Sequence, residues 1–192
     1  MARYLLICAL WLGWAQAAPT VKMTTTLGDI TIELDEVKAP NTTANFLKYV
    51  RSGFYDGTIF HRVIPGFVIQ GGGYDRALER KFTQDPIANE AHNGLKNTQY
   101  TLSMARTSNP HSATSQFFIN LVDNPMLDPQ GSDPHGYAVF GRVSAGQEVV
   151  QKIAAVPTGN AGGMSDVPTT AVEITKAVVV EDSPNKDSKE AK

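Results

Sequence analysis

Alternation of hydrophobic and polar residues is the main pattern along this chain, and it predicts more strand than helix. Within residues 21–34, every second residue from Ile30 to Leu34 is apolar. Side chains two apart in a strand share one face, so this segment is expected to bury one face and expose the other. Gly28 and Asp29 resemble a tight turn, and the segment is therefore predicted to form a β-hairpin.

Two segments show helical spacing instead of alternation. Residues 40–53 begin with Pro40, which suits the first turn of a helix, and the apolar pattern stops at Gly53. Residues 146–155 place apolar side chains three and four positions apart. Each segment is predicted to form a helix that covers an apolar surface.

Six further apolar or alternating runs are short and are bounded by Gly, Pro, Asn or Asp, as is typical of strands joined by irregular loops. Together with the hairpin they give about eight strands, which indicates an all-β barrel or sandwich. Two helices would suffice to cap the ends of a barrel of this size. The runs span residues 58–64, 66–71, 100–105, 116–121, 137–143 and 171–180.

The two ends of the sequence differ from the rest in composition. Arg3 precedes an apolar run over residues 4–14, and residues 15–17 fit the A-x-A pattern that signal peptidases cleave. The apolar run is too short to span a bilayer, which takes about 20 residues. We predict three parts: a cleaved signal peptide at 1–17, a single domain at 18–181 and a disordered charged tail at 182–192.

Charge and cysteine content narrow the possible partners. Lys and Arg total 17 and Asp and Glu total 19, and this net charge of -2 predicts neither nucleic acid nor an anionic membrane as a partner. Cys8 is the single cysteine and lies in the predicted signal, so no disulfide is expected in the mature protein. No stable membrane insertion is expected after cleavage of the signal.

Common signatures of metal, nucleotide and nucleophilic chemistry are missing from the sequence. It has no H-E-x-x-H, paired C-x-x-C, G-x-S-x-G or phosphate-binding G-x-x-x-x-G-K-[ST] motif. Glycines 71–73 fit a bulge or a close backbone approach better than a dinucleotide site. No metal and no cofactor are expected, because the spacing of the histidines also matches no common metal site: His61, His92, His111 and His135.

A charged residue stands among strand-forming apolar residues in segment 60–73. The segment reads F-H-R-V-I-P-G-F-V-I-Q-G-G-G, with Arg62 near its start and Phe67 and Gln70 close behind. From spacing alone, the simpler interpretation is an arginine at a barrel rim, with its stem packed and its guanidinium in water. The other interpretation is a functional cation beside an apolar pocket.

Segment 60–73 strongly resembles the signature of the cyclophilin family of peptidyl-prolyl cis/trans isomerases. Residues 103–120, S-M-A-R-T-S-N-P-H-S-A-T-S-Q-F-F-I-N, resemble the second motif of that family. The similarity extends over nearly all of 21–180 and is greatest to bacterial, periplasmic cyclophilins. It implies a closed eight-stranded antiparallel β-barrel capped by two α-helices, and an enzyme that isomerises X-Pro bonds in proline-containing, unfolded or partly folded polypeptides.

The resemblance also implies a role for each matching position. Arg62 would be the catalytic arginine, and Gln70 and Gln116 would hold Arg62 and the substrate backbone. The backbone of Ala105 and Arg106 would line the groove beside the pocket, where Arg106 replaces an asparagine of eukaryotic relatives. The proline ring would be surrounded by Phe67, Val68, Phe118, Leu127 and Tyr137, with Met126 next to Leu127.

These residue types suit the reaction. The X-Pro bond is planar through resonance, with a rotation barrier of about 18–20 kcal/mol, so a catalyst must favour the twisted amide. The guanidinium of Arg62 can donate to the proline nitrogen or carbonyl, while an apolar floor grips the ring and excludes water. Because no proton transfer is required, the rate is expected to be nearly constant from about pH 6 to pH 8.

Other functions remain open at this level. A proline-binding chaperone or scaffold would keep the pocket without significant turnover, although retention of Arg62, Gln70, Gln116 and Phe118 favours catalysis. The predicted signal favours the periplasm, with secretion to the medium as the second choice. A monomer is expected. Weak cyclosporin binding is also expected, since Met126 stands where the eukaryotic relatives that bind cyclosporin tightly have a tryptophan with an indole donor.

Overall fold

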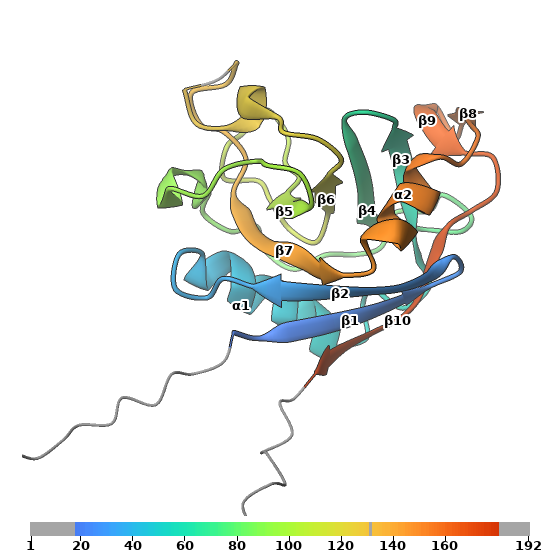
Figure 1. Cartoon of the computed structure of the whole chain (residues 1–192), viewed down its shortest axis with the longest axis horizontal. Coiled ribbons are helices and arrows are strands. Elements are labelled where there is room, and N and C mark those ends of the chain that lie inside the picture. The colour runs from blue at the N-terminus through green and yellow to red at the C-terminus, as the bar shows by residue number, and fades with distance from the viewer. Residues whose placement is uncertain (1–17, 131, 181–192) are drawn as a thin grey trace, which may run out of the picture.

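Strands dominate the computed structural model, which describes residues 18–130 and 132–180. Eight of them close into an antiparallel barrel in the order β1-β10-β3-β4-β6-β5-β7-β2 (Figure 1). This confirms the predicted fold class. The predicted signal peptide and the whole of the predicted tail lie outside the described residues. The barrel strands are β1 (Thr20–Thr25), β2 (Gly28–Leu34), β3 (Thr58–Ile64), β4 (Val68–Asp75), β5 (Thr101–Met104), β6 (Phe117–Asn120), β7 (Val139–Ala145) and β10 (Glu173–Val180).

Two α-helices cover the ends of the barrel, at the positions that helical spacing predicted. They are α1 (Pro40–Arg51) and α2 (Gln147–Ala154). Within the described ranges, neither these nor any other helix is long and apolar enough to cross a membrane. The remaining elements, which were not predicted, are two 3₁₀ turns, η1 (Ala91–Asn93) and η2 (Pro125–Leu127), and a two-stranded sheet of β8 (Thr158–Ala161) and β9 (Met164–Pro168).

The first hairpin forms, but its predicted turn at Gly28 and Asp29 is wrong. Both residues belong to β2, and the turn lies two residues earlier, at Thr26 and Leu27. The hydroxyl of Thr25 closes that turn, because it accepts from the Leu27 N–H at 3.1 Å and donates to the Gly28 carbonyl at 2.7 Å. Gly28 instead makes room for α2: a Cβ there would lie 2.8 Å from a methyl of Val149.

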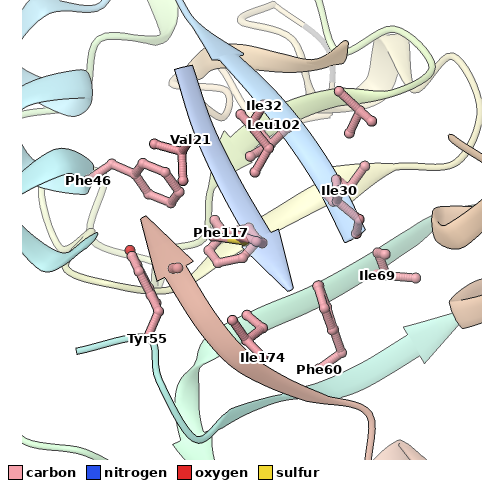
Figure 2. Packing of buried hydrophobic residues seen from close by; sticks show 14 of the residues in the cluster. Val21, Ile30, Ile32, Phe46, Tyr55, Phe60, Ile69, Leu102, Phe117 and Ile174 are labelled. Carbon is pink, nitrogen blue, oxygen red and sulfur yellow. The ribbon is translucent and has the colours of Figure 1, made fainter. Parts of the chain in front are cut away.

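Aliphatic and aromatic side chains together fill the core (Figure 2). The Phe117 ring packs nearly edge-on against Phe46 of α1, Tyr55 and Phe60, with centroids 5.6, 5.7 and 6.1 Å away. Burial of each such side chain contributes about 1.5–3 kcal/mol to stability. Phe118, the next residue along β6, lies outside this core cluster, as the alternation of a strand requires. The inner face of β6 therefore stabilises the barrel and leaves its outer face for other contacts.

Candidate active site

Three of the predicted site residues lie in one row across the outer face of the barrel. Arg62 on β3 is paired with Gln70 on β4, and Gln70 is paired with Phe118 on β6. Neighbouring residues of the same strands, such as Ile69 and Phe117, face the core. Strand pairing therefore brings together residues that are up to 56 positions apart in the sequence (118 minus 62).

An irregularity in β3 turns Arg62 outward. Phe60 and Val63 both belong to the core, so the two residues between them cannot follow simple alternation. The register of β3 against β4 shifts between Phe60 and Arg62, as in a β-bulge. Bulges of this kind commonly re-aim side chains beside active sites. This irregularity was not predicted, because apolar alternation shows only that a strand exists.

The Arg62 guanidinium has few protein contacts. Its side chain is 43% exposed, and its Nε lies 3.9 Å from a carboxylate oxygen of Asp166 on β9. Across residues 18–130 and 132–180 the structure shows no hydrogen bond from this guanidinium to another protein group. Its donors are therefore available to a ligand.

His61, immediately before Arg62, is buried and uncharged at neutral pH. Burial, and secondarily the Arg62 cation, lowers the pKa of His61 to about 4. Its ring packs on Tyr74 with centroids 4.7 Å apart, and its Nδ1 has no hydrogen-bond partner. At neutral pH, His61 is therefore neutral, and Arg62 beside it is charged.

The two predicted glutamines contact each other. Gln70 Nε2 donates to Gln116 Oε1 at 3.0 Å, which places both amides beside the Arg62 position. Gly73 permits this arrangement, since a Cβ there would lie 2.4 Å from Gln116 Cγ. The close approach predicted for glycines 71–73 is confirmed here. Neither amide accepts a hydrogen bond from the Arg62 guanidinium within residues 18–130 and 132–180, and contact of the amides with a substrate backbone stays a prediction.

Apolar groups adjoin this polar row. The Phe118 and Tyr137 rings meet at 74° with their centroids 5.7 Å apart. Tyr137 is joined to the η2 segment, because its N–H donates to the carbonyl of Leu127 at 2.9 Å. Met126, beside Leu127, is 46% exposed. Val68 is buried on β4, one residue after Phe67.

A buried network of amides supports the loops that carry Phe67 and Leu127. Asn124 Nδ2 donates to the Phe67 carbonyl at 3.1 Å and to Asn120 Oδ1 at 2.8 Å. Asn120 Nδ2 in turn donates to Asn97 Oδ1 at 3.2 Å. Buried polar groups stabilise a structure only when they are paired in this way. The sequence analysis missed this network, since no local pattern links asparagines from three separate segments.

Arg106 has the opposite environment from Arg62. Its side chain is 3% exposed, and its guanidinium forms an ion pair with Asp133 and donates to the carbonyls of Gly136 and Thr107. The same group lies over the Tyr137 ring, 4.4 Å from its centroid. The hydrogen bond from Arg106 lowers the pKa of the Asp133 carboxyl. The Arg106 side chain thus holds the loop that ends in Tyr137. Next to it, the backbone N–H of Ala105 donates to the Gln116 carbonyl at 3.0 Å.

A separate cleft of about 430 Å³ lies along β2 and β7. None of the predicted site residues lines it. It is lined by acidic, basic and aliphatic side chains, and among the described residues no aromatic side chain lies in it beside a cation. The chemistry of the residues, and not the volume of this cleft, therefore locates the candidate site on the outer face of β3, β4 and β6.

The fold and this site define a class of protein: a closed β-barrel that presents an available guanidinium next to aromatic and aliphatic groups. Comparison with known proteins identifies the family. Residues 20–179 match the family model described as cyclophilin type peptidyl-prolyl cis-trans isomerase. The chain belongs to this family and is a peptidyl-prolyl cis-trans isomerase, as the resemblance predicted.

Bacterial relatives share more than half of their residues with this chain. A peptidyl-prolyl cis-trans isomerase of Streptomyces antibioticus is 54% identical over 84% of this chain and 98% of its own length. Peptidyl-prolyl cis-trans isomerase B of Escherichia coli is also 54% identical, over 80% of this chain and 95% of its own length. A cyclophilin of Cryptosporidium parvum, solved in the presence of the dipeptide Ala-Pro, has a TM-score of 0.71 and 29% identity, covering 85% of this chain and 99% of its own.

Proposed function

We propose that this isomerase uses Arg62 to stabilise the twisted X-Pro amide and assists the folding of exported proteins. The observation that carries the catalytic part is the environment of Arg62, whose guanidinium is uncommitted beside Gln70 and the row that leads to Phe118. The aromatic and aliphatic groups around Phe118 and Tyr137 offer an apolar surface for a proline ring.

The proposed reaction requires only rotation. Twisting the amide localises a lone pair on the proline nitrogen, and that nitrogen becomes a hydrogen-bond acceptor. The planar guanidinium of Arg62 donates to it, or to the proline carbonyl, more strongly in the twisted state than in either planar state. Burial of the ring against Phe118 fixes one side of the bond and lowers the local dielectric. In this proposal the Gln70–Gln116 pair, whose amides are hydrogen-bonded to each other, holds the substrate backbone.

Export is supported by the sequence alone. The apolar run over residues 4–14 and the A-x-A pattern at 15–17 favour a signal peptide, and we propose the periplasm as the destination, with secretion to the medium as the second choice. A chain lacking residues 1–17 should stay in the cytoplasm, whereas the full chain should be recovered from the periplasm with Ala18 as its first residue. Recovery of both chains in the cytoplasm would exclude this part of the proposal.

The proposed substrates are unfolded or partly folded polypeptides with accessible X-Pro bonds, bound by a monomer. Cyclosporin is expected to bind weakly, because Met126 can fill apolar space but offers no N–H donor. Met126 is 46% exposed beside the pocket residues, so a tryptophan placed there could meet a bound cyclic peptide. Inhibition at nanomolar cyclosporin would contradict this expectation.

The decisive test is exchange NMR on an Ala-Pro peptide with the mature protein and with Arg62→Ala. Wild type should accelerate cis/trans exchange, and the variant should still bind peptide but lose about 100- to 1,000-fold in rate, the usual effect of removing one donor to a transition state. Arg142→Ala is a matched control, since Arg142 is an exposed barrel arginine paired only with Glu33 in the described residues. Binding without acceleration by wild type would replace the enzyme with a binding module.

A further inference from the structure

We propose that Asp166 is a positioning residue for Arg62. Its carboxylate holds the guanidinium by the Nε edge, which leaves both terminal nitrogens free to bind the substrate. This inference rests on the role of Arg62 given under Proposed function. It assigns a task to the β8–β9 sheet, which lies outside the barrel and contributes none of the residues considered so far except Asp166.

The Asp166 carboxylate faces the guanidinium at its Nε edge, at a distance longer than a hydrogen bond. Asp166 Oδ2 lies 3.9 Å from Arg62 Nε, and both side chains are partly exposed, at 41% and 43%. In the described part of the chain, neither side chain forms any other ion pair or hydrogen bond. The fork formed by Nη1 and Nη2, which suits recognition of a carbonyl, is therefore not occupied by protein.

The β8–β9 sheet is paired internally at its base and packs on the barrel along β9 and at its tip. The sheet lies against β3, the strand that carries Arg62 (Figure 1). At its base, the Thr169 N–H donates to the Pro157 carbonyl at 2.9 Å. At its tip, Gly162 lies so close to Leu78 that a Cβ would be 2.9 Å from a methyl of that residue. The packing of β9 on β3 therefore places the carboxylate beside Arg62.

The backbone of Asp166 has an uncommon conformation for a residue with a side chain. Its φ is +61°, in the left-handed region, and the next residue, Val167, is buried. Aspartate and asparagine tolerate this region better than most residues, because their short polar side chains can bond locally. Asparagine at 166 should therefore keep both the backbone and the shape of the side chain while removing the charge.

An exposed arginine samples many rotamers, and ordering it against the twisted amide in the transition state has an entropic cost. A nearby fixed carboxylate restricts those rotamers beforehand and lowers this cost. Exposed ion pairs are weak and are screened by salt, so we expect an effect of about two- to five-fold. The effect should fall on kcat, because the contacts of Arg62 are strongest in the twisted amide.

The test measures kcat and KM of wild type and Asp166→Asn with an Ala-Pro peptide, at low salt and at 1 M NaCl. At low salt kcat should be about two- to five-fold lower in the variant, with KM and Tm unchanged. At 1 M salt the difference should vanish, since the screening length falls to about 3 Å. An unchanged kcat, or a loss that persists in high salt, would overturn the proposal.

Two controls separate this inference from the function on which it rests. Glu33→Gln removes the carboxylate of a comparable exposed pair, Arg142 Nη2 to Glu33 Oε2 at 2.8 Å, and should leave kcat unchanged. In an Arg62→Ala background, Asp166→Asn should have no further effect. Full activity of Arg62→Ala would refute the proposed role of Arg62 itself. A strong loss in Arg62→Ala with normal Asp166→Asn would refute only the role of Asp166.

Discussion

Two arginines of this isomerase are found in opposite environments around one candidate site. The Arg62 side chain is 43% exposed and has one long ion pair, whereas the Arg106 side chain is 3% exposed and is fully engaged with Asp133, two carbonyls and the Tyr137 ring. Arg62 therefore has donors available to a ligand, whereas the donors of Arg106 are used in bonds that hold the loop.

The difference shows that partners, and not residue type, decide what an arginine can do. A guanidinium has five donors, and donors already bonded to protein are not available to a substrate. A buried arginine that loses its partners destabilises the fold, while an exposed one can be lost with little effect on stability. Activity should therefore depend most on Arg62, and stability on Arg106.

The largest expected effect comes from Arg62→Lys, which keeps the charge and removes the planar fork. We expect the rate of X-Pro exchange to fall by about 100-fold, with no change in the free energy of unfolding, because an ammonium cannot reproduce the directed donors of a guanidinium. Exchange NMR and urea unfolding measure the two quantities, and Arg142→Lys is the matched control. Near-normal activity would show that charge alone is sufficient.

A smaller effect is expected from Arg106→Met. The carbonyls of Gly136 and Thr107 lose their donor, and Asp133 loses its cation. We expect the free energy of unfolding to drop by about 2 kcal/mol, which lowers Tm by roughly 4–8 °C. Calorimetry of this variant and of Arg62→Ala should show a drop in Tm only for Arg106. Equal Tm values would remove the distinction between the two arginines.

The smallest effect concerns His61, the buried neighbour of Arg62. Its pKa is about 4 in the fold, below the value near 6.5 of an unfolded histidine. The unfolded chain therefore binds a proton first as pH falls, and stability is lost from about pH 6.5 down to about pH 4. Between about pH 7.5 and 5.5 this amounts to about 1 kcal/mol.

Urea unfolding at both pH values measures this change, with His61→Gln as the comparison. The variant should lack the histidine component, so its stability should change less with pH than that of wild type. Identical pH dependence in the two proteins would show that His61 titrates normally.

Much of the barrel could be predicted from the sequence, because alternation identifies strands that have one buried face. The predicted helices and all eight barrel strands are found, with ends shifted by a few residues. The turn after Thr25 was misplaced, since the glycine that suggested it serves the packing of Val149. The β8–β9 sheet was missed because β8 is largely exposed and so lacks the apolar alternation that marks a strand.

The candidate site was predicted through family resemblance and not through local pattern. Spacing alone left Arg62 as an ordinary rim arginine, and only the two motifs singled it out. What could not be predicted were the contacts between distant segments: the ion pair of Arg62 with Asp166, the engagement of Arg106, and the amide network around Asn120. These depend on the closed barrel, which brings such segments together.

The barrel is closed by its first and last strands. Thr20 pairs with Val180, so nearly the whole domain must be present before β1 finds its second neighbour. Contacts between such distant segments are formed late and slow the folding of a chain. A growing chain that lacks β10 would expose one edge each of β1 and β3, and such edges readily pair with other chains. We therefore expect this peptidyl-prolyl cis-trans isomerase to fold slowly itself and to be prone to aggregation until β10 is in place.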